Sequence, residues 1–236
     1  MAAPAPDEVQ VWALDLARTK AEVDELAATL SADELRRAAN MRIEASRRRW
    51  IVARAGLRAL VGSYLDEDPA AVAFAPGPHG KPRLEPPSEL RFSLAHSGEL
   101  ALLAVASERE LGVDLEWVGQ PRDALGLATR YFTNAERAAI AEAPEAERLA
   151  VFYRHWVAKE AFVKATGRGL SASLRSFEIE LAGPSAPRLV HVGGDSLEAM
   201  RWSLQLLDVP GGYAAALVAE APARARPIAA YDPLAE

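Results

Sequence analysis

The sequence contains no cysteine, so disulfide bonds, thiolate zinc sites and cysteine nucleophiles are all excluded. It also has no apolar run that approaches the roughly 20 residues a membrane-spanning helix needs. The first residues, MAAPAPDEVQ, lack the basic region followed by an apolar stretch that is typical of a secretory signal. These absences predict a cytoplasmic protein that does not bind a membrane.

Several common catalytic signatures are missing as well. There is no GxSxG nucleophile elbow, no Walker phosphate loop and no GxGxxG dinucleotide fingerprint. The four histidines, at positions 79, 96, 155 and 191, do not have the spacing of metal ligands. The sequence therefore argues against a zinc site.

The chain has 236 residues, half of them apolar and a quarter charged, which is ordinary for a soluble globular protein of one or two domains. Its net charge of -6 argues against bulk nucleic-acid binding. The average hides a basic segment, because Arg36–Arg58 holds eight arginines and a single acid, Glu44. Such a segment is either a solvated helix face or a binding surface for phosphate or an acidic partner.

Periodicity and turn residues predict the order of the secondary structure. Ser31 is placed to cap the helix that follows it. We expect helices over residues 32–43, 46–65, 133–142 and 147–166, strands over 9–16, 175–182, 201–207 and 213–219 and from Leu111, and a hairpin over 91–106.

The two halves of the chain show a similar rhythm. The segment ELALLAVASE at 99–108 resembles GYAAALVAEA at 212–221, and each follows a predicted long helix. This pattern predicts two related α+β halves joined near residue 110. The residues from 221 on are expected to form a tail that either becomes ordered late or is frayed.

Asp114 and Glu116 lie two residues apart in a predicted strand, so both carboxylates project from one face. Neighbouring carboxylates repel each other unless a cation neutralises them. A hard ion such as Mg²⁺ suits oxygen ligands and commonly takes one or two carboxylates plus substrate phosphates. The alternative for an isolated DxE pattern is an exposed strand face.

Glu160 interrupts an apolar stripe on the predicted helix over 147–166, and Lys164 follows it at i+4. A carboxylate flanked by bulky apolar residues must be paired, hydrogen-bonded or coordinated. Glu160 is therefore a candidate third ligand beside Asp114 and Glu116, although a surface Glu–Lys pair is the simpler alternative.

Two further segments carry weaker signals. His96 lies in a predicted strand just before a hairpin turn, where a histidine is more often a structural filler. The loop GPHGKPRL offers glycine backbone and Lys81 to a phosphate, and is otherwise an ordinary turn.

Taken in order, these segments resemble the 4′-phosphopantetheinyl transferases, in particular the larger Sfp-like type. The similarity covers residues 47–170, and the pattern GxDxE followed by WxxKExxxKxxGxGL is specific. The matching blocks are GKP at Gly80–Pro82, FSLAHS at Phe92–Ser97, GVDLE at Gly112–Glu116, RYF at Arg130–Phe132 and WVAKEAFVKATGRGL at Trp156–Leu170.

The resemblance implies an α+β fold in which two similar halves, residues 1–110 and 111–236, form a pseudo-dimer with the active site in the cleft between them. It implies transfer of 4′-phosphopantetheine from coenzyme A to a serine of an apo acyl, peptidyl or aryl carrier protein. Adenosine 3′,5′-bisphosphate would be the other product. We expect a monomer that binds neither nucleic acid nor membrane.

The resemblance also implies roles for individual residues. Mg²⁺ would bridge the coenzyme A pyrophosphate, with Glu160 also serving as general base, directly or through water. Lys164 would contact the pyrophosphate and His96 the phosphate being transferred, with Lys159 a further candidate in the same cluster. The expected metal ligands are Asp114, Glu116 and Glu160, and the other expected coenzyme A contacts are Lys81 near the nucleotide and Arg49 and Arg54 at the 3′-phosphate.

One departure concerns residue 95, which is alanine where many relatives have a phosphate-contacting serine. It puts discrimination between coenzyme A and dephospho-coenzyme A in question. Two other functions stay open at this point: a non-catalytic coenzyme A or nucleotide-binding protein, and another Mg²⁺-dependent phosphoryl-transfer or hydrolytic enzyme.

Overall fold

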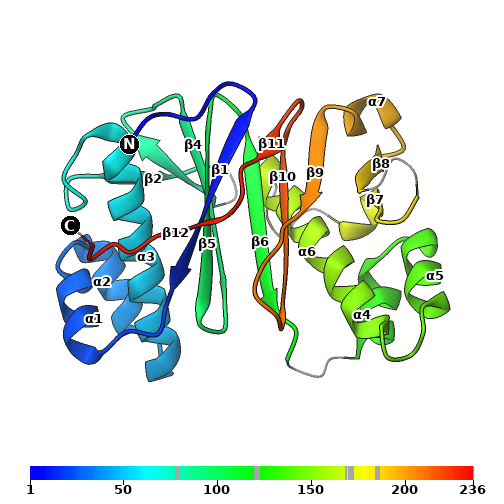
Figure 1. The fold of residues 1–236 in the computed structure, drawn as a ribbon, viewed down its shortest axis with the longest axis horizontal. Helices are drawn as coiled ribbons and strands as arrows, with labels where there is room; N and C mark the ends of the chain where they lie inside the picture. The colour runs from blue at the N-terminus through cyan, green and yellow to red at the C-terminus, as the bar shows by residue number, and fades with distance from the viewer. Residues whose placement is uncertain (78–79, 120–122, 168, 170–172, 184–186, 236) are drawn as a thin grey trace.

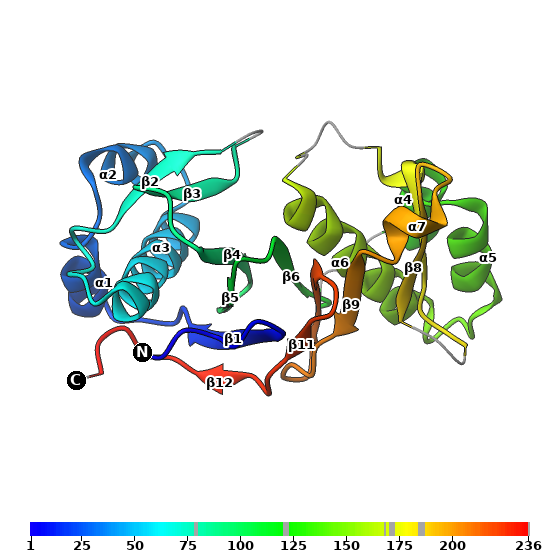
Figure 2. The ribbon, with the colours of Figure 1, turned by 90° about the horizontal axis from the view of Figure 1, so that it is seen from above.

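The computed structural model describes residues 1–77, 80–119, 123–167, 169, 173–183 and 187–235. The fold is α+β, as the sequence predicts. Two antiparallel sheets lie side by side in the middle of the molecule, and a long helix packs on the outer side of each (Figures 1 and 2).

The first sheet is built from β1 (Glu8–Asp15), β4 (Leu90–Ser97) and β5 (Leu100–Ser107), with β5 in the centre. The helix α3 (Glu44–Leu65) covers it, and an apolar core that includes Leu14, Leu57 and Leu103 fills the space between them. The predicted hairpin at 91–106 and the helix at 46–65 are confirmed within a few residues.

The second sheet repeats this arrangement with β6 (Leu111–Trp117), β9 (Trp202–Leu206) and β10 (Tyr213–Glu220), and β10 is its central strand. The helix α6 (Arg148–Thr166) covers it. In each half the chain therefore runs from one edge strand through helices to a hairpin, and the last strand of the half lies in the centre of the sheet. This shared topology is consistent with two similar halves.

The two sheets meet along β4 and β6 through side chains. Ser93 Oγ accepts a hydrogen bond from Val113 N at 3.1 Å, and Ser97 Oγ accepts one from Trp117 N at 3.0 Å. An apolar cluster that includes Val11, Leu102 and Leu217 lies between the sheets. Serine hydroxyls thus replace backbone pairing at this seam.

The last segment of the chain forms ordered structure, the first of the two expected alternatives. The short strands β11 (Arg224–Ala225) and β12 (Ala229–Ala230) pair in parallel with β1, so the chain returns to the first half (Figure 1). A second side-chain seam joins this returning segment to β9. There, Ala223 N donates to Ser203 Oγ at 3.2 Å and Ala225 N donates to Gln205 Oε1 at 3.1 Å.

Shorter elements complete the fold. Three of the helices begin with a capping box, in which an N-cap hydroxyl and the glutamate three residues later satisfy each other's backbone N–H groups. Ser31 caps its helix as predicted. The remaining elements are α1 (Lys20–Ala27), α2 (Ala32–Ala39), β2 (Ala73–Pro76), β3 (Pro82–Glu85), α4 (Ala124–Tyr131), α5 (Asn134–Glu142), a 3₁₀ helix (Leu174–Ser176), β7 (Phe177–Glu180), β8 (Arg188–Val192) and α7 (Ser196–Ala199).

Within the described residues, no helix combines the length and the apolar character needed to cross a lipid bilayer.

Candidate active site

Strand β6 and helix α6 approach each other closely enough to bring their polar side chains together. Gly112 makes this possible, because a Cβ atom there would lie 2.1 Å from Ala161 O and 2.4 Å from Ala165 N. A larger residue would push the helix away from the strand. The glycine of the GVDLE segment therefore places Asp114 beside the helix that carries Glu160.

Asp114 is buried against Lys164, whose Nζ donates to Asp114 Oδ1 at 2.7 Å and to Val113 O at 3.2 Å. The other carboxylate oxygen, Asp114 Oδ2, is buried and has no hydrogen-bond partner within the described part of the chain. Burial raises the pKa of Asp114 to about 6, against the lowering effect of Lys164 and with a further rise from Glu116 and Glu160. The site thus holds a buried carboxylate with one oxygen available.

Glu116 and Glu160 are electrostatic neighbours of Asp114. Burial raises the pKa of Glu160, Lys164 lowers it, and Glu116 raises it further. Glu116 Oε2 also accepts a hydrogen bond from Ser97 Oγ at 3.2 Å. The three predicted carboxylates therefore lie in one region of the structure.

The three carboxylates are nevertheless not gathered into a ready-made metal site. Among the described residues, no group of three or more histidine, aspartate or glutamate side chains is arranged to hold a metal ion. Like charges repel one another in the protein alone, and the Lys164 ammonium supplies the positive charge beside Asp114. The three-ligand metal site therefore stays a prediction.

A pocket of about 410 Å³ joins the two halves of the chain. Its wall includes α3 and β4 from the first half and α6 from the second. Five residues predicted from the sequence line this pocket: Arg54, Lys81, His96, Glu160 and Lys164.

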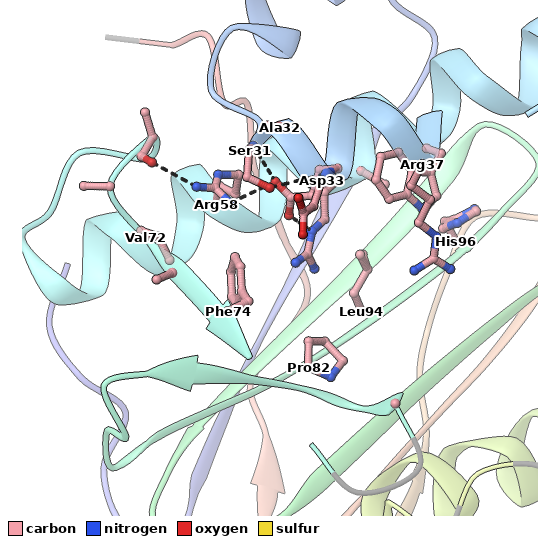
Figure 3. A pocket seen from close by; sticks show the side chains of 18 residues that line it. Ser31, Ala32, Asp33, Arg37, Arg58, Val72, Phe74, Pro82, Leu94 and His96 are labelled. Atoms are coloured by element: carbon pink, nitrogen blue, oxygen red, sulfur yellow. Dashed lines mark hydrogen bonds and ion pairs between the residues drawn. The ribbon is translucent and has the colours of Figure 1, made fainter. Parts of the chain in front are cut away.

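A second, larger pocket of about 710 Å³ adjoins it within the first half. Figure 3 shows Arg37 and His96 at one end of this pocket and Arg58 and Val72 at the other. Arg37 and Arg54 line both pockets. Sequence reasoning missed Arg37 as an individual candidate, because it is one of eight arginines in the basic segment and only the position of α2 singles it out.

Arg54 is held in place at the pocket wall. Its Nε donates to Glu34, and its guanidinium carbon lies 4.3 Å from the centre of the Phe74 ring. Arg58 Nη1 donates to the same carboxylate at 2.9 Å and is almost fully buried. Arg54 is therefore an oriented cation with a guanidinium stacked on an aromatic ring, an arrangement suited to a phosphate.

Arg49 is paired with an acidic residue. Its Nε donates to Glu99 Oε1 at 2.9 Å, and Arg49 is absent from the described linings of both pockets. The Arg49 cation is nevertheless close enough to His96 to lower the pKa of that ring. The expected contact of Arg49 with the 3′-phosphate therefore stays a prediction.

Lys81 lines the 410 Å³ pocket, but its ammonium is already engaged. Its Nζ donates to Glu110 Oε2 at 2.8 Å, to Leu111 O at 3.0 Å and to Ala165 O at 3.4 Å. Burial lowers the pKa of Lys81, while Glu110 raises it. Lys81 therefore links the loop before β3 to both β6 and α6.

Lys159 does not join the cluster around Glu160. Its side chain is fully buried on another face of α6, where Nζ lies 2.8 Å from Glu136 Oε1. It also donates to Leu174 O at 2.7 Å and to Phe177 O at 2.9 Å. The structure does not support the expectation that Lys159 contacts coenzyme A, because its ammonium has no path to the pocket.

His96 and Ala95 face opposite sides of β4. His96 lines both pockets, and burial together with the cations Lys164 and Arg49 lowers its pKa, which favours a neutral ring. Ala95 is buried in the apolar cluster between the sheets. Residue 95 is therefore outside the described linings of both pockets, and the effect of an alanine there on the choice between coenzyme A and its dephospho form stays a prediction.

Four residues of the predicted motifs and loops, Pro78, His79, Arg168 and Leu170, lie outside the described residues. Gly167 and Gly169 are described and line the 410 Å³ pocket.

The chain is similar to several known proteins. A family model described as the 4′-phosphopantetheinyl transferase superfamily matches residues 110–218. The 4′-phosphopantetheinyl transferase HetI of Nostoc sp. (strain PCC 7120) is 38% identical over 218 residues, which cover 91% of this chain and 88% of HetI. The 4′-phosphopantetheinyl transferase Sfp of Bacillus subtilis (strain 168) is 30% identical over 125 residues, which cover 53% of this chain and 54% of Sfp.

Among solved structures, a holo-(acyl-carrier-protein) synthase from Bacillus anthracis in complex with CoA (3′,5′-ADP) is similar with a TM-score of 0.39 and 20% sequence identity. The match covers 47% of this chain and 94% of that chain.

Proposed function

This chain belongs to the 4′-phosphopantetheinyl transferase superfamily, and from that premise we propose that it transfers 4′-phosphopantetheine from coenzyme A to a serine hydroxyl of an apo carrier protein. One observation carries the proposal. A single pocket of about 410 Å³ brings Arg54, Lys81 and His96 of the first half together with Glu160 and Lys164 of the second.

The reaction forms a bond between the serine oxygen and the β-phosphorus of coenzyme A, and it breaks the pyrophosphate bond. The leaving group is adenosine 3′,5′-bisphosphate. Glu160 accepts the serine proton, directly or through water, and its raised pKa makes it a stronger base than an exposed glutamate. Lys164 and the neutral ring of His96 offer donors to the phosphate oxygens.

Asp114, Glu116 and Glu160 would hold a Mg²⁺ ion. The fit rests on the buried Asp114 Oδ2, which has no partner within the described residues, and on a donor set made of oxygen alone. When bound, Mg²⁺ supplies positive charge for the pyrophosphate. The carboxylates that repel one another in the protein alone would then share a counter-ion.

Arg54 and Arg37 would bind the nucleotide phosphates, because both line the two adjoining pockets. The partner is an acyl, peptidyl or aryl carrier domain, and the exposed arginines of α2 and α3 would attract an acidic partner surface. We also propose that the protein acts as a monomer, since residues from both halves of one chain form the pocket. We further propose that it acts in the cytoplasm.

The test is incubation with coenzyme A, Mg²⁺ and purified apo carrier proteins of several classes, read by intact mass. We expect one phosphopantetheine group to be added per carrier. The variant Glu160→Gln should lower the rate by about three orders of magnitude, since it removes the base and a metal ligand.

The matched control is Glu142→Gln, an exposed glutamate of α5, which should leave the rate unchanged. An unmodified carrier in every class would contradict the proposal. Cleavage of coenzyme A without any carrier would instead indicate a hydrolase.

A further inference from the structure

The ion pair between Lys159 and Glu136 has no role in the chemistry described so far. Both side chains are fully buried, and Nζ lies 2.8 Å from Glu136 Oε1. The Lys159 ammonium lies near the rings of Phe132 and Phe177, 5.6 and 4.3 Å from their centres. This pair is the most enclosed charge pair in the described part of the chain.

The pair connects several elements of the second half at one point. Lys159 donates to two backbone carbonyls, Leu174 O and Phe177 O, at the start of β7. Glu136 is the third residue of the α5 capping box, where Oε2 accepts from Thr133 N at 2.9 Å, and its Oε1 accepts from Ile179 N at 2.8 Å. The ammonium and the carboxylate therefore bind α5, α6 and β7 together.

Lys159 immediately precedes Glu160, and consecutive helical residues are about 100° apart around the axis. If Lys159 is fixed on one side of α6, the direction of Glu160 is fixed on another. At its start, α6 has no side-chain cap, because Glu147 makes no capping hydrogen bond. Lys164 lies four residues after Glu160, on the same face of α6, so a rotation of the helix about its axis would redirect both side chains together.

Stability does not explain why a charged pair occupies this position. Removing two charges from water costs free energy, and replacing a buried ion pair by apolar residues of similar volume is often neutral or stabilising. A residue pair retained for its geometry would satisfy several acceptors with directional bonds, as this one does.

We propose that Lys159 is a positioning residue for the transfer reaction, which holds α6 in the rotation that directs Glu160 and Lys164 at the pocket. The proposal rests on the proposed function. Lys159 touches no reacting atom, so its loss should lower the rate of the chemical step and leave the binding of coenzyme A nearly intact.

The test uses the double variant Glu136→Gln, Lys159→Met, which removes both charges and keeps the side-chain lengths. We expect kcat for carrier modification to fall at least tenfold, with the KM for coenzyme A changed less than threefold. Assays run well below the thermal midpoint of each variant separate this effect from unfolding. The matched control is Glu198→Gln, Arg201→Met, the same exchange in a solvent-accessible pair formed by Glu198 of α7 and Arg201 just after that helix, which should change neither parameter.

A second variant, Glu136→Asp, covers the case in which the double variant does not fold. It keeps the charge and shortens the reach by about one methylene, so it should lower kcat several-fold without changing the KM for coenzyme A. If the double variant, or Glu136→Asp in its place, keeps the wild-type kcat, or loses kcat only in proportion to its folded fraction, the positioning role is wrong. If the wild-type protein itself fails to modify any carrier, the proposed function fails instead.

Discussion

The two halves of the molecule share a topology and fill the space between helix and sheet in opposite ways. When the central strands β5 and β10 are matched end to end, the strand registers place Trp12 where the second half has Asp114. They likewise place Leu14, which is fully buried, where the second half has Glu116. The first half packs apolar side chains at the positions where the second half holds carboxylates.

The helices α3 and α6 show a matching difference. We aligned α3 and α6 on Trp50 and Trp156. Arg54 of α3 then takes the position of Glu160, and Arg58 takes the position of Lys164. The acid of the second half is thus replaced by a cation in the first. One half provides carboxylates and the other provides arginines to the same composite site.

Both halves nevertheless anchor the long helix with the same device. In each, the third residue of a capping box on the preceding helix accepts a bond from a basic residue: Glu34 from Arg58, and Glu136 from Lys159. The first pair borders a pocket, and the second is completely enclosed. An open pair can share its cations with a ligand, whereas an enclosed pair can only hold its neighbours in place.

The largest expected effect concerns the loss of folding stability that a buried carboxylate causes. The variant Asp114→Asn tests it in metal-free protein. The pKa of Asp114 is raised to about 6 in the folded state, above its value in the unfolded chain. The wild type therefore loses stability as pH rises from about 4 to 6, because the folded state holds its proton more tightly. We expect the variant to gain about 3 kcal/mol relative to the wild type between pH 4 and pH 7.

Urea unfolding at several pH values, with chelator present, measures this difference, and the titrating groups that do not interact with Asp114 cancel in it. Parallel curves for the two proteins would mean that Asp114 is not penalised by burial. The comparison of the halves would then lose its energetic basis.

A smaller effect tests the contribution of the arginines. Arg54→Met should raise the KM for coenzyme A about tenfold or more, since one charge-assisted contact to a phosphate contributes about 1.5–3 kcal/mol. Arg47→Met is the matched control on the same helix, because Arg47 pairs with Glu44 and lies outside the two pocket linings. Steady-state kinetics of both variants decide the point, and equal effects would contradict the assignment of Arg54.

The smallest effect concerns the two seams. Ser93 Oγ accepts a hydrogen bond from Val113 N of β6. When β5 and β10 are matched end to end, Ser93 corresponds to Gln205, whose Oε1 accepts a hydrogen bond from Ala225 N in the other seam. We expect Ser93→Ala and Gln205→Ala each to destabilise the protein by about 1 kcal/mol, because each leaves a backbone N–H without its partner.

Thermal or urea unfolding measures both changes. An unchanged stability of the Ser93→Ala variant would show that the serine hydroxyl does not hold the first seam together. It would also end the equivalence between the two seams.

Sequence patterns predicted most of what depends on local order. The long helices, the hairpins and the Ser31 cap follow from periodicity and capping residues, which act over a few positions. The helix α1 was missed although Thr19 and Glu22 form a capping box, because its apolar face is short. The strands β11 and β12 could not be predicted, since two residues pair there only because the edge of β1 is available.

The candidate site shows the same division. Asp114, Glu160 and Lys164 follow from spacing within one strand or one helix, and the structure brings them together. Lys159 was grouped with Glu160 because the two are adjacent in sequence, whereas adjacency on a helix turns side chains apart. Arg37 and the Glu34 pairs depend on how α2 packs, which no local pattern contains.

The return of the chain to β1 has a consequence for how the protein is made. The edge of the first sheet beside β1 stays open until residues 224–230 have been synthesised, so a ribosome-bound chain exposes unpaired backbone there almost to the end of translation. A fragment ending at residue 110 would carry the same open edge permanently and would be prone to aggregate when expressed alone.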